Sequence, residues 1–531
     1  MMTLKQKIGQ FFFPAVFIND TEENIQATEA LIRDHNIGGL TFFHSRASAA
    51  TNYESKQKVV SYDDSYFKLK QLITRYQKCA TTPLLMSIDA EWGLAMRIEK
   101  TPQYPYAITL GALPESQIDL VYEVGKQIGL DLKAAGIQYN LAPLADINNN
   151  PNNPVIGYRS FGENKEKVAL FANAYLKGMS DAGILGCLKH FPGHGNTNVD
   201  SHLGLPILEE NLEQLLHNEL YPFIKGIENK VDSIMIGHLA VPALNDGKNT
   251  SATLSKNIIE NLLRKQLGFE GLVISDALNM KSVSDLFEQK GQLEWEAFQA
   301  GNDILCFTDE VAAGIEAIQN NAAEERINES YNRIQHYKQK AGLFENGSIY
   351  PDTSQSKIDF SISENLNRRI AEQILTKVKT DTNTNRIQEA IANNSLAQVS
   401  IYKDGFATKV TQNSTTPIFS LTVENPMLKQ EDLAQYDTIV ISIFVPKAKP
   451  LNQFDIQPQV IESISTLLHN KNCILYVFGN PYALQVIPNL ALAKEIIMVY
   501  QDFEVFQEVA AQQFLNKLAC PGLLPVSIKN I

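Results

Sequence analysis

GILGCLKHFPGHGNTNVDSH, residues 183–202, joins a short apolar run to a loop rich in titratable side chains. The run 183–188 has the composition of a strand that is buried on both faces. Three histidines, one lysine and one aspartate follow within the next fourteen residues, although the whole chain has only nine histidines. We therefore expect this loop to carry function and not merely to cover the surface.

The same alternation of a short apolar run and an amphipathic stretch repeats from residue 37 to about residue 345. The runs predicted to be strands are Ile37–Phe43, Leu84–Asp89, Ile137–Leu144, Gly183–Leu188, Asp232–Ile236, Gly271–Ser275 and Asp303–Phe307. Helical spacing predicts helices between them, for example Gln117–Ala135, Asn164–Ala182, and Leu254–Leu267 with Thr253 and Ser255 as caps. A serial βα repeat is typical of a parallel sheet, either closed into a barrel or doubly wound and open.

Polar residues that follow the predicted strands favour the barrel. They come after many different strands: His44, Asp89, Glu91, Asp146, Lys189, His190, His238 and Asp276. A barrel builds its site from many strand ends, whereas an open doubly wound sheet concentrates its chemistry beside one Gly-rich turn, and no such fingerprint is found. The predicted fold class is therefore α/β, with a TIM-type (β/α)8 barrel. The polar segment His44–Phe67 is long for a βα loop and is either a lid or a disordered excursion.

The second part of the chain predicts another domain. Residues 341–362 are rich in Gly, Ser, Pro, Asp and Thr and lack periodicity, as in a linker. We assign the barrel to 1–345, the linker to 346–365, and a smaller C-terminal α/β open-sheet domain to 366–531. Its predicted elements are a helix at Glu364–Val378, strands at Leu396–Tyr402, Ile418–Val423, Thr438–Phe444, Cys473–Phe478 and Glu495–Tyr500, and helices at Val460–His469 and Phe503–Leu518. It carries few titratable clusters, which favours a supporting role.

Charge and composition exclude several classes of partner. The 531-residue chain has a net charge of −13, which disfavours binding to nucleic acid or to an anionic membrane. No apolar run approaches the roughly 18 residues of a membrane span. The five cysteines are odd in number and far apart, so we expect buried free thiols. The short apolar stretch Ile8–Ile18 contains Pro14 and is interpreted as the first structured element. We expect a cytoplasmic protein, or a periplasmic one if an export signal has been removed.

Metal and serine-nucleophile chemistry both fit poorly. The spacings HxH, HExxH and CxxC are absent, and Pro192 with its two neighbouring glycines argues against a helix that pairs His190 with His194. Ser201 lies between Asp200 and His202, but the GxSxG elbow of serine hydrolases is missing. We predict no metal and no cofactor.

Glycoside chemistry remains as the assignment. A retaining mechanism needs a carboxylate nucleophile and a nearby proton donor that later acts as base. Asp276 ends a predicted strand and would face a barrel mouth, although a cap for the next helix is the alternative. His202, paired with Asp200, is the best-placed proton donor, since an imidazole titrates near neutrality.

At these residues the sequence resembles a known family. KHFPGHGNTNVDSH is similar to the signature of the bacterial β-N-acetylglucosaminidases of glycoside hydrolase family 3. ISDALNM resembles that family's nucleophile segment, SIDAEWGLAMR its sugar-binding segment, and NPVIGYRSFG its Arg-Ser-Phe turn. The order and spacing agree over roughly residues 1–345, and GLLPVSI at 522–528 resembles the end of a family C-terminal domain.

The resemblance implies a role for each matching residue. Asp276 would be the nucleophile, and His202 the acid/base held by Asp200. The residues implied to bind the sugar are Asp89, Arg97, Arg159, Lys189 and His190. A structural ion pair is the alternative for Arg97 and Arg159. The commoner family pattern after the sugar-binding aspartate is Gly-Gly-Arg, where this chain has Glu91, Trp92, Gly93 and Leu94, so the arginine of that run is lost.

The expected function is a retaining exo-β-N-acetylglucosaminidase that acts on peptidoglycan fragments or other oligosaccharides with a terminal GlcNAc. One alternative is a β-glucosidase-like or phosphorolytic enzyme of the same family, because a histidine would not repel phosphate as a carboxylate would. The other is a catalytically inactive carbohydrate-binding barrel. The presence of Asp276, His202 and Asp200 together argues against that alternative.

Overall fold

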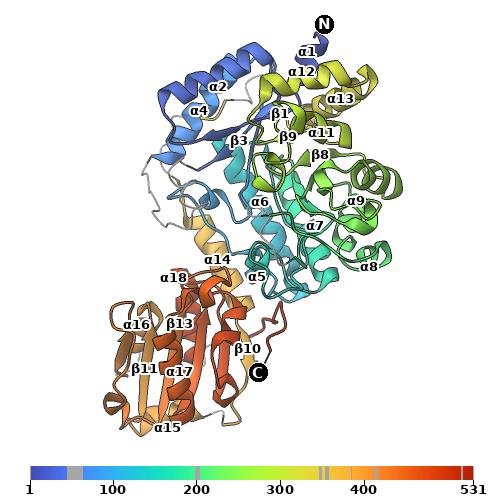
Figure 1. Cartoon of the computed structure of the whole chain (residues 1–531). Helices are drawn as coiled ribbons and strands as arrows, with labels where there is room; N and C mark the ends of the chain where they lie inside the picture. The colour runs from blue at the N-terminus through green and yellow to red at the C-terminus, as the bar shows by residue number, and fades with distance from the viewer. Residues whose placement is uncertain are drawn as a thin grey trace. The chain divides into compact units, whose positions relative to one another are not determined.

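The computed structural model describes residues 2–44, 64–197, 204–345, 350–352, 358–383, 385–412, 416–515 and 518–529. Contacts divide the chain into two compact units (Figure 1). The first unit comprises Met1–Tyr104, Val121–Ile147 and Val168–Ser363, and the second comprises Pro105–Leu120, Asn148–Lys167 and Glu364–Ile531. Most of the long polar segment predicted at 44–67 lies outside the described residues.

The first unit is built on parallel strands. They are β1 (Phe12–Phe13), β2 (Ala15–Phe17), β3 (Gly39–Phe43), β4 (Leu85–Ile88), β5 (Tyr139–Asn140), β6 (Cys187–Phe191), β7 (Ser233–Ile236), β8 (Leu272–Ser275) and β9 (Leu305–Cys306). They pair in the orders β2-β3-β4-β5, β6-β7-β8 and β1-β9, and every one of these pairings is parallel. Single parallel bridges join Tyr139 to Leu185, Leu144 to Lys189, and Ile274 to Ile304. The prediction of a parallel α/β fold is confirmed.

Helices follow most of these strands along the chain. They are α1 (Leu4–Gly9), α2 (Glu22–His35), α4 (Ser65–Cys79), α6 (Ile118–Ala135), α7 (Lys165–Asp181), α8 (Leu212–His217), α9 (Tyr221–Glu228), η6 (Asn257–Gln266), α10 (Lys281–Ser284), α11 (Gln292–Ala300), α12 (Val311–Asn321) and α13 (Glu324–Lys340). Single-turn helices are η1 (Leu94–Met96), η4 (Pro242–Leu244) and η5 (Ala252–Leu254). In α6 the apolar residues at three- and four-residue steps, Val121, Val124, Ile128 and Leu132, are buried, which confirms the predicted helix.

One predicted helix cap is confirmed and the other is wrong. The Ser255 hydroxyl accepts a hydrogen bond from the backbone N–H of Ile258 at 3.3 Å, beside the start of η6. Thr253 is buried and its hydroxyl contacts His238 and the carbonyls of Ile236 and Gly237. The sequence spacing alone predicted a cap because it does not show which strand end lies against this residue.

The interior of the first unit contains a few polar groups that satisfy one another. The Tyr139 hydroxyl donates to Ser233 Oγ at 2.6 Å, and the hydroxyls of Thr41 and Ser87 are 2.9 Å apart. Cys187 and Cys306 are buried free thiols. The expectation of free cysteines is confirmed, although Cys79 and Cys520 are only partly buried.

A buried carboxylate lies at the amino end of β9 and holds three arginines. Asp303, just before β9, is fully buried and contacts Arg264 at 2.7 Å, Arg333 at 2.6 Å and Arg326 at 3.5 Å. Burial alone would raise the pKa of Asp303, but the three guanidinium groups lower it to about 2. Asp303 and the three arginines contact one another, so they form a structural network at the amino end of β9.

A buried lysine ties the last helix of the first unit to its N-terminal segment. Lys338 on α13 is fully buried, and its ammonium group donates to Gln10 Oε1 at 2.7 Å and to the Pro83 carbonyl at 2.8 Å. Burial lowers the pKa of Lys338 to about 7, because the two acceptors carry no formal charge.

We expect the stability of the first unit to rise with pH between about 7 and 10. The unfolded lysine keeps its proton up to about pH 10.4, so the unfolded state binds more protons than the folded state across this window. The free energy of unfolding should therefore increase by up to ~1.4 kcal/mol per pH unit relative to Lys338→Met. Urea denaturation followed by tryptophan fluorescence measures this unit, since both tryptophans, Trp92 and Trp295, belong to it. A pH-independent difference between the two proteins would contradict the lowered pKa.

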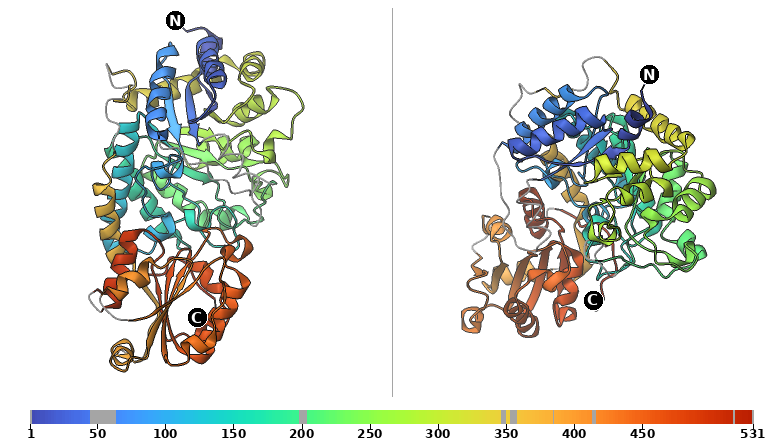
Figure 2. Two further views of the ribbon diagram at one scale, coloured as in Figure 1. Left: turned by 90° about the vertical axis from the view of Figure 1, so that its left-hand side faces the viewer. Right: turned by 45° about the horizontal axis from the view of Figure 1, so that its top comes forward.

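The second unit contains a six-stranded sheet. Its strands are β10 (Thr376–Lys379), β11 (Leu396–Ile401), β12 (Ile418–Leu421), β13 (Thr438–Phe444), β14 (Asn472–Phe478) and β15 (Glu495–Met498). They lie in the order β10-β15-β14-β13-β11-β12, with only β10 antiparallel to its neighbour. Figure 1 shows this sheet with some of its strands labelled, and Figure 2 gives two further views of it. Helices in this part of the chain are α5 (Ala107–Leu110), α14 (Ser361–Ile374), α15 (Arg386–Ala392), α16 (Gly405–Thr411), α17 (Pro458–Asn470) and α18 (Glu504–Phe514).

The predicted strands of this unit are confirmed to within two residues, but two helix predictions are wrong at their ends. The helix predicted over Phe503–Leu518 ends at Phe514. The helix predicted over Glu364–Val378 ends at Ile374, and β10 begins at Thr376. Thr376 is buried and Lys377 exposed, because β10 pairs with β15 at the edge of the sheet. Among the described residues of the whole chain, no helix combines the length and apolar character that crossing a bilayer requires.

Candidate functional site

The candidate site lies at the carboxyl ends of the strands in the first unit. His44 follows β3, Asp89 follows β4, His238 lies just beyond β7, and Asp276 follows β8. Lys189 and His190 lie within the second half of β6, and not after the strand as the predicted range Gly183–Leu188 implied. Because all pairings are parallel, these ends share one edge, which is where α/β folds of this kind place their chemistry.

Asp89 is the centre of a charged cluster that brings three of the predicted sugar-binding residues together. Its Oδ1 is 2.8 Å from Lys189 Nζ, and its Oδ2 accepts from the Arg97 guanidinium at 2.9 Å. Lys189 Nζ is also 2.8 Å from Glu91 Oε1. Side chains from β4, its loop and β6 are thereby held in fixed positions, as a binding site for a polar ligand requires.

The charges of this cluster are set by the local environment. Burial alone would raise the pKa of Asp89, but Lys189 and Arg97 outweigh burial and hold that pKa well below its usual range. Burial and the positive charge of Arg97 lower the pKa of His44 to about 3. His44 is therefore neutral at ordinary pH, and Asp89 is a carboxylate that can accept hydrogen bonds from ligand hydroxyls.

His190 is held by a buried carboxylate. Its ring Nδ1 is 2.8 Å from Asp146 Oδ2, and Asp146 is fully buried. The same carboxylate accepts the backbone N–H groups of His190 at 3.2 Å and His194 at 2.7 Å. Asp146 thus anchors the strand end and the following turn. The sequence placed Asp146 after a strand but gave no reason to pair it with His190.

The turn after β6 packs tightly against its neighbours. A side-chain carbon added at Gly195 would lie 1.7 Å from the Ile147 carbonyl oxygen, so only glycine fits there. His194 is buried, and burial together with the nearby His190 lowers its pKa to about 4. His194 and Gly195 therefore determine the shape of this turn. Asp200 and His202, the predicted acid/base pair, lie outside the described residues.

Asp276 is placed at the end of β8 by its backbone and its side chain. Its N–H donates to the Ile236 carbonyl at 3.0 Å, and its Oδ1 accepts the Ala277 N–H at 2.8 Å. The next helix, α10, begins at Lys281 and is preceded by Met280 at its cap position. The alternative of Asp276 as the cap of this helix is therefore wrong.

Arg159 belongs to the second unit, at the end of the single-turn helix η3 (Gly157–Arg159). Its guanidinium donates to the Val155 carbonyl at 3.3 Å. Its role in binding a sugar stays a prediction. Glu91 has a contact that sequence reasoning missed, because nothing in the spacing shows that it pairs with Lys189.

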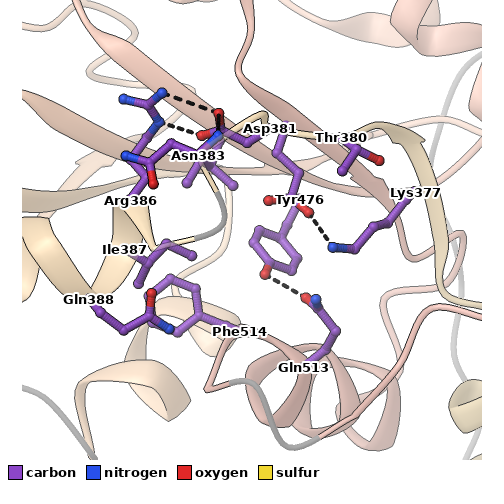
Figure 3. Close-up of a pocket in the computed structure, with 12 residues that line it drawn as sticks. Lys377, Thr380, Asp381, Asn383, Arg386, Ile387, Gln388, Tyr476, Gln513 and Phe514 are labelled. Atoms are coloured by element: carbon purple, nitrogen blue, oxygen red, sulfur yellow. Dashed lines mark hydrogen bonds and ion pairs between the residues drawn. The ribbon is translucent and has the colours of Figure 1, made fainter.

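A polar cavity lies inside the second unit (Figure 3). It has a volume of about 140 Å³ and is lined by residues from β10, α15, β14, β15 and α18. Arg386 pairs with Asp381, and Lys377 with Glu495 at 2.8 Å. The charges of Arg386, Asp381, Lys377 and Glu495 are paired with one another along the wall of this cavity, an arrangement that stabilises the packing of β10, β15 and α15. We assign no chemistry to it.

Comparison with known families finds a match to the Glycosyl hydrolase family 3 N terminal domain over residues 3–337. Beta-hexosaminidase A of Pseudoalteromonas piscicida is 36% identical over 287 residues, which is 52% of this chain and 46% of that protein. Beta-hexosaminidase of Xylella fastidiosa strain M12 is 32% identical over 257 residues, covering 48% of this chain and 70% of that protein. The matched part thus spans less than half of the first relative.

Solved structures are similar over nearly the whole chain. A glycoside hydrolase family 3 beta-N-acetylglucosaminidase from Paenibacillus sp. str. FPU-7 has a TM-score of 0.79 and 26% identity, with 99% of each chain covered. Beta-glucoside phosphorylase BglX has a TM-score of 0.81 at 18% identity, covering 99% of this chain and 94% of that one, which shows a shared fold alone. Both units described above therefore occur together in known enzymes.

Proposed function

Since the chain belongs to glycosyl hydrolase family 3, we propose that it is a retaining exo-β-N-acetylglucosaminidase. The observation that carries this proposal is the shared strand edge, where Asp276 follows β8 and the Asp89–Lys189–Arg97 cluster joins β4 to β6. A carboxylate nucleophile and a set of fixed hydrogen-bonding groups for sugar hydroxyls are the two requirements of retaining glycosidases. The relatives named beta-hexosaminidase support the choice of sugar.

We propose further that the strands of the first unit close into a (β/α)8 barrel. The bridges Tyr139–Leu185 and Ile274–Ile304 connect the three described sheets in sequence, and the β1–β9 pairing joins the first strand to the last. We keep 1–345 as the catalytic domain, 346–365 as the linker and 366–531 as the C-terminal domain. Closure of the barrel would bring all of the strand ends around one mouth.

The first chemical step transfers the sugar to the enzyme. The Asp276 carboxylate attacks the anomeric carbon while His202 protonates the glycosidic oxygen, so the aglycone leaves as an alcohol and a covalent glycosyl-aspartate forms. Asp200 orients the imidazole and stabilises its protonated form before the transfer.

The second step returns the enzyme to its starting state. The neutral His202 removes a proton from water, and the resulting nucleophile displaces Asp276 from the anomeric carbon. Two inversions give net retention of the β configuration. Each proton moved in the first step is recovered in the second, so the reaction needs no cofactor.

The sugar is held by the charged cluster and its neighbours. Asp89 accepts from sugar hydroxyls, while Lys189, Arg97 and His190 donate to hydroxyls or to the N-acetyl carbonyl. For Arg159, sugar binding is proposed from the family resemblance alone. Charged groups give the strongest hydrogen bonds of this kind. The low pKa of Asp89 keeps it an acceptor throughout the range in which the enzyme would work.

A substrate comparison tests this function. We expect nitrophenyl β-N-acetylglucosaminide to be cleaved with a far higher kcat/KM than the corresponding β-glucoside, and a GlcNAc-β-N-acetylmuramyl disaccharide to release GlcNAc. The product should be free GlcNAc whether or not phosphate is present. Equal cleavage of both glycosides would contradict the GlcNAc assignment, and formation of GlcNAc phosphate would show a phosphorolytic enzyme.

A further inference from the structure

His238 has both ring nitrogens engaged beside the candidate nucleophile. It lies just after β7 and is fully buried. Its Nε2 is 2.9 Å from the Ala277 carbonyl oxygen, and its Nδ1 is 2.8 Å from Thr253 Oγ1. Because a carbonyl oxygen only accepts, Nε2 carries a proton and donates it to Ala277.

The ring of His238 is itself held in place. Thr253, on η5, is fully buried, and its hydroxyl lies 3.2 Å from the carbonyls of both Ile236 and Gly237. The Thr253 carbonyl accepts from the Asn302 side-chain amide at 2.9 Å. The imidazole is therefore fixed by contacts from β7, from η5 and, through Thr253, from the segment that precedes β9.

Ala277 is the residue through which His238 acts on Asp276. The Ala277 N–H donates to Asp276 Oδ1 at 2.8 Å, so the position of residue 277 orients the carboxylate. Leu278, the next residue, donates its N–H to the Cys306 carbonyl at 2.9 Å. The Ala277 carbonyl of this turn is held by a side chain from the neighbouring strand end, that of His238.

We propose that His238 is a positioning residue for the nucleophile. It anchors Ala277, whose N–H aims the Asp276 carboxylate at the anomeric carbon. This inference rests on the proposed role of Asp276. Reacting atoms must approach within about 3–3.5 Å, and a misplacement of about 1 Å costs on the order of 10²-fold in rate. A His238 that merely filled space would affect stability and leave the reactivity of the carboxylate unchanged.

The test compares His238→Ala and His238→Asn, with Ser282→Ala as a local control. Ser282 lies on α10, is buried, and its hydroxyl has no hydrogen-bond partner among the described residues. An aryl glycoside with a fluorinated sugar traps the glycosyl-enzyme and gives two readouts. The final extent of labelling counts intact sites, and the rate of labelling reports the reactivity of Asp276.

We expect His238→Ala to lower kcat per labelled site, and the labelling rate, by about 10²-fold with KM changed little. His238→Asn should recover part of the loss, since its amide can donate to the Ala277 carbonyl. Ser282→Ala should label and turn over like the unchanged protein. If His238→Ala does not fold, His238→Asn carries the test, with a slower labelling rate expected.

Wild-type labelling rates in the folded His238 variants would overturn the positioning role. The same holds if only the extent of labelling falls, because that is the signature of a structural residue. Failure of the proposed function is a separate result, since it would appear as retained turnover in Asp276→Ala. An inactive Asp276→Ala together with fully active His238 variants would refute only the inference about His238.

Discussion

Asp276→Ala is expected to lower kcat/KM on every β-N-acetylglucosaminide by on the order of 10⁴-fold or more. The carboxylate is the proposed attacking group of the first step and the leaving group of the second, so its removal eliminates the covalent route and leaves only binding and the acid/base group. The fold should persist, because the backbone N–H of residue 276 still donates to the Ile236 carbonyl. Steady-state kinetics and a thermal unfolding curve measure the two effects.

Chemical rescue separates a lost nucleophile from a damaged site. A small anion such as azide or formate fits the space left by the carboxylate and attacks the anomeric carbon from the same face. With azide on an activated aryl substrate, turnover should rise and the product should have the α configuration. Turnover by Asp276→Ala in the absence of any added anion would contradict the proposed mechanism. Ser282→Ala should remain fully active and is the control for local packing.

His202→Ala is expected to give losses that depend on the leaving group. A poor leaving group such as a sugar alcohol needs protonation, so its kcat/KM should fall by about 10²–10⁴-fold, whereas an activated nitrophenyl glycoside should fall much less at the first step. A series of aryl glycosides of graded leaving-group pKa measures this as a steeper dependence of rate on that pKa.

The neighbouring carboxylate supplies the matched variant for that series. Asp200→Asn keeps the shape of the side chain but removes the charge that stabilises the protonated imidazole, so its losses should lie between those of the unchanged enzyme and His202→Ala. If His202→Ala lowered kcat/KM equally for good and poor leaving groups, the proposed role of His202 as the acid would be wrong. The function would then need another proton donor.

The sequence alone located most of the framework. Short apolar runs bounded by Gly or polar residues gave strands that the structure places within a few residues, for example β7 and β8, because a strand buried on both faces admits little else. The same pattern placed Asp89, Lys189 and Asp276 at strand ends, where parallel strands bring their chemistry together. The edge strand β10 was missed, since its pairing with β15 leaves only a weak alternation in four residues.

The tertiary structure decided which of these side chains are partners. Asp89 and Lys189 are 100 residues apart in the chain, and His238 is 39 residues from Ala277, so no spacing rule connects them. Spacing determines the face or the end of an element on which a residue lies, whereas a hydrogen bond depends on which strand ends adjoin in the folded sheet. For that reason the sequence established the kind of chemistry and the strand ends that carry it. Only the packed fold showed that Asp146 holds His190 and that His238 contacts the turn of Asp276.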